Sequence, residues 1–286
     1  MTHLARGRDP LRSAADLLVD RLVAKGSFGA VTNLARWFPV EVVGDLIGLP
    51  REGRERLLPL LDAKFNCFGP DNARTQTSFP QLPELAQYVM ASATRGALPE
   101  DSMGRAVYGT VDAGEIPEAA APWLVMTYVT AGMDTTVHAI GHTVWLMAQH
   151  PDQWDALRAD RSLVPQAFSG GRALRVTGPG VRTTARVDRS VGDVTAGARL
   201  AVLYGSANRD ERKWADADRF DITRNNLDHL GFGYGLHGCA GQALARLEGE
   251  AILRALLRSV SRIEAGDPVR HFNHILPGFA ASSCRP

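Results

Sequence analysis

Residues 117–151, PEAAAPWLVMTYVTAGMDTTVHAIGHTVWLMAQHP, form a long, mostly apolar stretch that ends at a proline. A helix that is hydrophobic nearly all round lies in the middle of a domain, so the rest of the chain must pack around this one. Its middle holds four residues that are poor helix formers: Gly132, Asp134, Thr135 and Thr136. Breaks of a local rule cluster at functional sites. The sequence therefore predicts a fold built on this helix, with a candidate site at its middle turn.

Helical patterns also dominate the sequence before this stretch. Further helices are expected at 10–25, 30–47, 51–66, 84–95 and 151–168. In the first of them the apolar residues have helical spacing: Leu11, Ala14, Ala15, Leu18 and Leu22. Residues 71–83 are polar and hold two prolines, which predicts a loop, and residues 96–116 suit a connector with a short helix.

The sequence after residue 168 changes in character. Residues 169–199 are rich in Gly, Arg, Thr and Val, which predicts turns and short strands, and 199–205 is the best single strand. Residues 206–230 are polar and irregular, and the C-terminal tail suggests a last hairpin. Because no linker stands out, we expect one mainly α domain with a small β portion, spanning residues 1–286.

The charge balance disfavours several function classes. The chain has 286 residues, 45% of them hydrophobic and 22% charged, which is ordinary for a globular protein with a sizeable core. A formal net charge of +1 gives no basic field for nucleic acid. No apolar run reaches transmembrane length, and the N-terminus lacks the apolar core of a signal peptide. We therefore expect a cytoplasmic protein with no nucleic-acid or membrane partner.

The three cysteines, Cys67, Cys239 and Cys284, are too scattered for a disulfide framework or a zinc site, which fits a reducing compartment. Cys239 lies in the glycine-rich segment 231-GFGYGLHGCAGQ-242, just before a helix expected at 243–257. Unpaired N–H groups and the dipole at a helix N-terminus favour a thiolate, and the glycines let further N–H groups approach the sulfur. Such a thiolate is a good iron ligand. The alternative is a small buried cysteine beside a turn.

The spacing around Cys239 supports the ligand interpretation. The segment reads F-x-x-G-x-H-x-C-x-G and resembles the haem-ligand loop of the cytochrome P-450 family, the haem-thiolate monooxygenases. The resemblance implies haem b as cofactor, with Cys239 as the axial iron ligand. It implies that His237 contacts a haem propionate and that Phe232 shields the sulfur. Gly233 and Gly241 belong to the same cofactor-binding loop.

The middle of the apolar stretch carries a second resemblance to this family. Residues 131–136, AGMDTT, are similar to the A-G-x-D-T-T of the long central helix of the family. The resemblance implies that Ala131 and Gly132 make room over the haem, and that Asp134 and Thr135 relay protons to dioxygen. The alternative is a helix kink in which a threonine bonds its own backbone.

Other segments carry weaker signals. Residues 205–224 resemble the segment that precedes the cysteine loop in bacterial members, with Arg219 as its structural arginine. Arg182 is placed where the family has a propionate-binding arginine; a surface arginine is the alternative. The family's E-x-x-R pair lacks its acid, because Arg172 stands where a glutamate is expected before Arg175. A short compensated reading-frame slip within 169–190 is our hypothesis for this departure.

Substrate and partners follow from the resemblance alone. The segments 65-FNCFGP-70, 205-GSANRD-210, 221-DITR-224 and 245-ARLEGE-250 are closest to bacterial enzymes that oxidise para-substituted benzoic acids. Phe65 and Phe68 are then walls of a small aromatic substrate's pocket, or else ordinary core residues. Thr127 falls where that group has a hydroxyl near the substrate carboxylate, although Met126 replaces its arginine.

Electrons are expected from a 2Fe–2S ferredoxin and its NAD(P)H reductase, with Arg209, Arg212 and Lys213 as docking candidates or simply a solvated charge cluster.

Two other interpretations stay open. The resemblance covers the C-terminal two thirds to three quarters of the family fold, which implies that the N-terminal part is missing and that an apolar face is uncovered. The chain is then either a working monooxygenase or a truncated, catalytically inactive haem-thiolate remnant. A metal hydrolase is the other alternative, because His138 and His142 have the i, i+4 spacing of zinc ligands.

Overall fold

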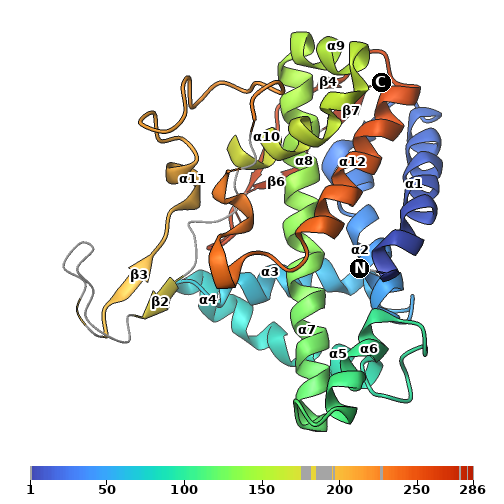
Figure 1. The fold of residues 1–286 in the computed structure, drawn as a ribbon, viewed down its shortest axis with the longest axis vertical. Coiled ribbons are helices and arrows are strands. Elements are labelled where there is room, and N and C mark those ends of the chain that lie inside the picture. Colours follow the sequence, from blue (N-terminus) through green and yellow to red (C-terminus); the bar gives the residue numbers. More distant parts are fainter. Residues whose placement is uncertain are drawn as a thin grey trace.

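The computed structural model describes residues 2–174, 182–184, 195, 197–225, 228–276, 278–281 and 283–285. It describes the backbone alone for 2–8, 172–174, 182–184, 199, 201, 281 and 283–285. The described part is mainly helical with three small sheets, as the sequence predicts (Figure 1). Among the described helices, none is both long and apolar enough to cross a membrane.

The helices that build the fold are, in chain order, α1 (Thr2–Val23), α2 (Phe38–Ile47), α3 (Leu57–Asn66), α4 (Ala73–Ser78), α5 (Leu82–Ser92), α6 (Met103–Asp112), α7 (Ala121–Gly132), α8 (Asp134–Gln149), α9 (Pro151–Ala159), α10 (Val164–Leu174), α11 (Tyr204–Ala207) and α12 (Gln242–Ser259). Short turns of other helical types include η1 (Ala30–Ala35), η3 (Phe79–Gln81), η6 (Leu230–Phe232) and η7 (Gly235–His237).

The strands are short and pair antiparallel. They are β1 (Phe28–Gly29), β2 (Arg182–Thr184), β3 (Arg199–Ala201), β4 (Glu264–Ala265), β5 (Val269–His271), β6 (Gly278–Ala281) and β7 (Ser283–Arg285). The sheet orders are β1-β7-β4, β2-β3 and β5-β6. The pairing of β5 with β6 is the C-terminal hairpin that the sequence suggests.

The apolar stretch is the axis of the fold, as expected. Helices α7 and α8 follow one another through the middle of the molecule (Figure 1). Helices α10 and α12, the turn η1 and strand β6 all pack against α8, which is buried along nearly its whole length. Helices α2, α5 and α6 pack against α7. The site that the sequence places at residues 131–136 therefore lies at the junction of these two helices.

The N-terminal amphipathic helix is confirmed, and it packs against α12. Five of its apolar residues are buried against the core: Leu11, Ala15, Leu18, Val19 and Leu22. At the rim of this contact, Arg258 of α12 forms ion pairs with Asp16 and Asp20 of α1. This packing holds the helix that follows the cysteine loop from one side, while α8 and α10 hold it from others.

The loop expected at 71–83 is wrong, because the segment forms α4, η3 and the start of α5. The side chain of Asn72 caps α4 by accepting hydrogen bonds from the backbone N–H groups of Arg74 and Thr75. Both prolines lie in first turns, where a missing N–H costs nothing. The polar composition of this segment therefore predicted a loop, although Asn72 and the prolines in fact begin helices.

Two boundaries after residue 168 also differ from expectation. Helix α10 continues to Leu174, because Gly171 is a contact residue and not a turn residue: a Cβ there would collide with Thr143 of α8. The strand expected at 199–205 ends at Ala201, and the chain turns into α11, with the N–H of Asn208 bonded to the Tyr204 carbonyl.

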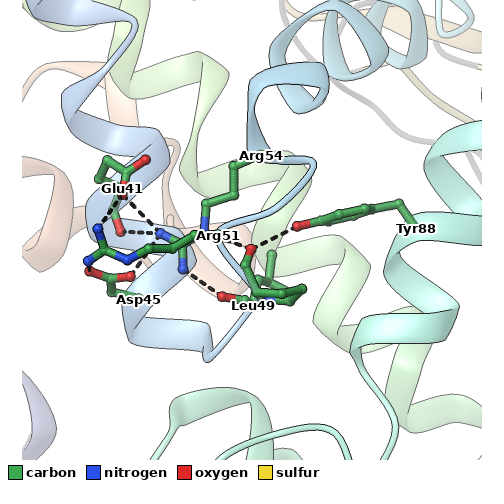
Figure 2. Close-up of polar contacts among 7 residues, drawn as sticks. Glu41, Asp45, Leu49, Arg51, Arg54 and Tyr88 are labelled. Carbon is green, nitrogen blue, oxygen red and sulfur yellow. Dashed lines mark hydrogen bonds and ion pairs between the residues drawn. The ribbon is translucent and has the colours of Figure 1, made fainter.

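A buried arginine joins α2 to the start of α3 (Figure 2). The guanidinium of Arg54 is 2.8 Å from Asp45 and 3.2 Å from Glu41. It also donates to the carbonyls of Leu49 and Pro50 at 2.6 and 3.0 Å. Only 4% of Arg54 is exposed, so its charge depends on these partners. The neighbouring Arg51 reaches the same two carboxylates from the surface.

Candidate functional site

The axis breaks at Met133, between α7 and α8. The N–H of Met133 reaches the Val129 carbonyl at a long 3.4 Å, and Met133 has a ψ of −72°. Across the break, the Thr135 hydroxyl donates to the Ala131 carbonyl at 2.7 Å. Threonine bonds of this kind bend helices. The kink and the threonine–backbone bond considered from the sequence are therefore both present at the predicted site.

Asp134 and Thr135 point in different directions from this break, since neighbours on a helix are about 100° apart. Thr135 is partly exposed on the same face as Ala131. Asp134 is only 6% exposed, and its Oδ2 atom has no hydrogen-bond partner. Burial, helped by the negative charge of Asp62, raises the pKa of Asp134 to about 7. The carboxyl can therefore hold a proton near neutral pH.

The histidine pair of α8 is a buried cluster. The Nε2 atom of His138 lies 3.6 Å from Asp134 Oδ1, but burial first and then the neighbouring histidines lower the pKa of His138 to about 3. The contact is therefore not an ion pair at neutral pH. His138 stacks on His271, and His142 meets the ring of Phe279 edge-on. Among the described residues, no group of three or more His, Cys, Asp or Glu is placed to hold a metal ion.

The cysteine loop is an exposed turn that leads into α12. Gly233 and Gly235 have φ angles of +69° and +66°, which only glycine adopts without strain. The loop closes where the N–H of Cys239 donates to the Phe232 carbonyl at 2.8 Å. Phe232 is buried beneath the guanidinium of Arg246. Cys239 itself is partly exposed, three residues before α12 begins.

Glu248 shows where α12, the helix after the cysteine loop, lies relative to the break at Met133. It lies in α12, is fully buried, and faces Thr136 of α8. Neither carboxyl oxygen of Glu248 has a well-formed hydrogen bond. Burial raises the pKa of Glu248 well above its ordinary value, and the nearby Thr136 hydroxyl opposes this only in part. The first turns of α12 therefore lie alongside the start of α8.

We expect Glu248→Gln to stabilise the protein above neutral pH by about 1–3 kcal/mol, because it removes a buried carboxyl without partners. The folded protein keeps a proton on Glu248 that the unfolded chain releases above pH 4.5, the ordinary pKa. Stability from this group is complete below pH 4.5 and falls as the pH rises towards the folded pKa. Urea unfolding between pH 5 and 8.5 should show a shallower fall in the variant. A less stable variant at pH 8 would contradict this.

Most other predicted cofactor residues have a described position. Gly132 faces α2, because a Cβ there would meet Val43 at 3.3 Å. His237 is exposed in η7, and a Cβ at Gly241 would meet the Cys239 sulfur at 3.9 Å. Arg182 lies on β2, but its side chain falls outside the described residues. Of the E-x-x-R segment, the backbone of residues 172–174 is described, as part of α10, and Arg175 lies outside the described residues.

The proposed substrate residues occupy two helices. Phe65 of α3 is buried, and Phe68 just after α3 is 54% exposed, with the two rings edge to face at 6.2 Å. Thr127 of α7 is exposed, and its hydroxyl donates to the Trp123 carbonyl. Met126 is buried. The apolar side chains beside Thr127 are also exposed: Trp123, Leu124 and Tyr128.

The cationic cluster proposed for docking is exposed and paired. Arg209 lies 3.4 Å from Asp218, Arg212 lies 2.6 Å from Asp210, and Lys213 lies 3.7 Å from Asp228. Arg219 is exposed beside the same segment. Surface pairs of this kind contribute about 0–1 kcal/mol each, so their role in folding is small.

Sequence reasoning missed two parts of this region. Glu248 could have been found, since it stands at a core position of the helix, three residues after Ala245 and four before Ile252, both buried. The second part is the pair formed by Asp62 and His271, whose Oδ1 and Nε2 atoms are 2.7 Å apart. No local sequence pattern predicts a contact between residues so far apart in the chain.

Haem b, which the resemblance implies, fits the residues present. The donor is a partly exposed cysteine sulfur in a glycine-rich turn, where a side chain at Gly241 would contact that sulfur. Apolar side chains are exposed on both sides of the site, Tyr234 and Leu236 in the loop and Tyr128 on α7. In this structure a cysteine loop precedes one helix, and that helix packs beside a break in a second helix. This arrangement is typical of haem proteins of the thiolate-ligated class.

Comparisons with known proteins agree with this class. The family model described as Cytochrome P450 matches residues 187–274. The chain is 41% identical to cytochrome P450 CYP199A2 of Rhodopseudomonas palustris over 281 residues. This alignment covers 96% of this chain and 68% of that protein. Cytochrome P450 107B1 of Saccharopolyspora erythraea is 32% identical over 256 residues, 87% of this chain and 62% of that protein. The chain belongs to the cytochrome P450 family.

Solved structures match the same fold. CYP164A2 of Mycobacterium smegmatis, with econazole bound, has a TM-score of 0.88 at 26% identity and covers 98% of this chain and 74% of that one. CYP109Q5 of Chondromyces apiculatus has a TM-score of 0.84 at 26% identity, over 98% and 72%. Haem b is the family's cofactor and monooxygenation its reaction class. This chain spans about two thirds of the length of the two curated relatives, 68% and 62%.

Proposed function

We propose that this chain forms the haem-binding and oxygen-activating part of a bacterial monooxygenase that acts on a small aromatic substrate. The observation that carries the proposal is the cysteine loop, which leads into α12 where that helix packs against α8, with Glu248 facing Thr136. One oxygen atom of O₂ enters a C–H bond of the substrate and the other leaves as water, which consumes two electrons and two protons. The bound haem supplies the oxygen chemistry.

The residues of the chain have distinct roles in this proposal. Cys239 holds the iron through its sulfur, and the glycines of the turn let the backbone approach the cofactor. Asp134 holds a proton at its carboxyl near neutral pH and delivers it towards the partly exposed Thr135 hydroxyl. Phe65 and Phe68 offer an aromatic wall that would exclude water from a substrate ring.

Electrons come from a redox partner in this proposal, a 2Fe–2S ferredoxin served by an NAD(P)H reductase. Arg209, Arg212 and Lys213 are the docking candidates, since an exposed cationic cluster steers an acidic partner at low salt.

A reduced carbon-monoxide difference spectrum tests the proposal. The protein reconstituted with haem should give the Soret shift that is specific to a thiolate ligand, and Cys239→Ser should abolish it. Cys67→Ser is the matched control, since Cys67 is also a partly exposed free cysteine but lies just after α3. A Cys239→Ser protein with an unchanged thiolate spectrum would overturn the assignment.

A second candidate is a haem-thiolate protein without turnover. The observation that favours it is the exposed apolar face of α7, where Trp123 is 56% and Tyr128 42% exposed. A thiolate spectrum without product from para-substituted benzoates, in the presence of a ferredoxin and its reductase, would support this candidate over the working enzyme.

A further inference from the structure

A cavity of about 190 Å³ lies beside the break in the axis, against a face of α8 that differs from the one carrying Thr135. It is lined in part by apolar side chains from η1, α3 and β6. Its polar lining is assembled from segments far apart in the sequence: Arg36, Asp62, Asp134, His138 and His271. A cavity with this many polar groups is suited to water, and each water needs only about 10–15 Å³.

The inner end of the cavity is a carboxyl with a free oxygen. Asp134 is 6% exposed, and while its Oδ1 atom faces His138 at 3.6 Å, its Oδ2 atom has no hydrogen-bond partner. An orphaned buried carboxyl oxygen in a polar cavity calls for a bridging water. His138 is held beside it because Gly278 of β6 has no side chain; a Cβ at that position would collide with the His138 ring.

The outer end is an acid–histidine pair that reaches the surface. His271 Nε2 donates to Asp62 Oδ1 at 2.7 Å, and each of the two side chains is a quarter to a third exposed. Although burial raises the pKa of Asp62, hydrogen bonds from His271 and Asn273 lower it below its usual value overall. Asp62 is therefore ionised near neutral pH, and its carboxylate is placed to accept a hydrogen bond from the His271 ring. The His271 ring also stacks on His138, with 5.4 Å between ring centroids.

We propose that this cavity is the proton-entry path to Asp134, with the Asp62–His271 pair taking up protons from solvent and water in the cavity carrying them to Asp134 Oδ2. The inference rests on the proposed monooxygenase function, in which each turnover consumes two protons. His138 is a positioning residue in this path: it stays neutral and holds the Asp134 carboxyl in place.

The electrostatics around Asp134 fit a carboxyl that gains and loses a proton. The groups facing it come from the elements packed around the cavity: Arg36 after η1, Asp62 from α3, His138 from α8, and His271 from β5. Asp62 raises the pKa of Asp134, while Arg36 and His271 lower it. Removing the charge of Asp62 must therefore shift the titration of Asp134 towards lower pH.

Carboxyl ¹³C NMR on aspartate-labelled full-length protein tests this without turnover. Asp134 should titrate near neutral pH in the wild type and at lower pH in Asp62→Asn. Asp112→Asn is the matched control, since Asp112 is an exposed carboxyl of α6 paired with Arg95. Water–protein cross-relaxation should also detect ordered water next to the His138 ring. An Asp134 titration that is the same in Asp62→Asn and Asp112→Asn, or a dry cavity, would overturn the proposal.

Turnover of the haem-loaded protein gives the second readout. Asp62→Asn and His271→Phe should each slow product formation by at least about tenfold and raise the solvent deuterium isotope effect. The phenylalanine of His271→Phe keeps the stacking on His138, so this variant tests the path if Asp62→Asn does not fold. If Asp62→Asn and His271→Phe turn over at the same rate as Asp112→Asn, the proposed proton path is wrong. An absent thiolate spectrum in the wild type would instead refute the proposed function, and the NMR results would still decide the cavity's role.

Discussion

Arg54→Met is expected to lower the free energy of unfolding by about 1.5–3 kcal/mol, because it removes the charge-assisted hydrogen bonds of a buried guanidinium. The carbonyls of Leu49 and Pro50 lose their donor, and the carboxylates of Glu41 and Asp45 keep only the exposed Arg51 as a partner (Figure 2). Methionine fills much of the volume, so the loss reflects the polar contacts more than a cavity. Urea unfolding followed by far-UV circular dichroism measures the change.

Arg51→Met provides the control for this loss. Arg51 contacts the same carboxylates but is 77% exposed, so its removal should cost no more than about 1 kcal/mol. If the two variants lose similar stability, the buried guanidinium of Arg54 in Figure 2 contributes no more than the exposed one of Arg51, which contradicts the prediction.

Asp134→Asn is expected to reduce product formation by about 10²–10⁴-fold, the range for loss of a positioned proton donor. Because the pKa of Asp134 is about 7, the wild-type rate should fall as the pH rises above 7, where the carboxyl no longer carries a proton. The asparagine variant should lack this pH dependence and keep its thiolate spectrum. Steady-state rates from pH 6 to 9 measure both effects.

A stability measurement separates this role from a structural one. The folded protein holds a proton on Asp134 up to about pH 7, whereas the unfolded chain releases it above 3.8. Wild-type stability from this group is therefore lost as the pH rises through 7, and Asp134→Asn should be the more stable protein above that pH. A slow variant that is also less stable at pH 8 would indicate structural damage.

The sequence predicts the axis of the fold because its signals are local. A stretch that is apolar all round has to be central, and polar residues in its middle have to be accommodated by a break, which the structure places at Met133. The cysteine loop is equally local, since its glycines adopt the turn that their spacing implies. The roles assigned to individual site residues remain predictions, because no ligand contact defines them here.

Other features depend on contacts that no short window contains. Asn72 is a helix cap only because the residues after it fold back as α4, so the segment was misread as a loop. Gly171 was misread as a turn residue, since its contact with Thr143 joins helices far apart in the sequence. The pair formed by Asp62 and His271 joins α3 to a C-terminal strand, and only the assembled fold brings them together.

The exposed face of α7 gives the protein an internal optical reporter. Trp123 lies on this face with 56% of its surface in solvent, whereas Trp154 of α9 is 1% exposed and donates its indole N–H to the Ser261 carbonyl. The first indole emits at long wavelength and is reached by a dissolved quencher, and the second is shielded. A molecule that binds to α7 will therefore change the emission wavelength and the quenching of Trp123 and leave those of Trp154 unchanged.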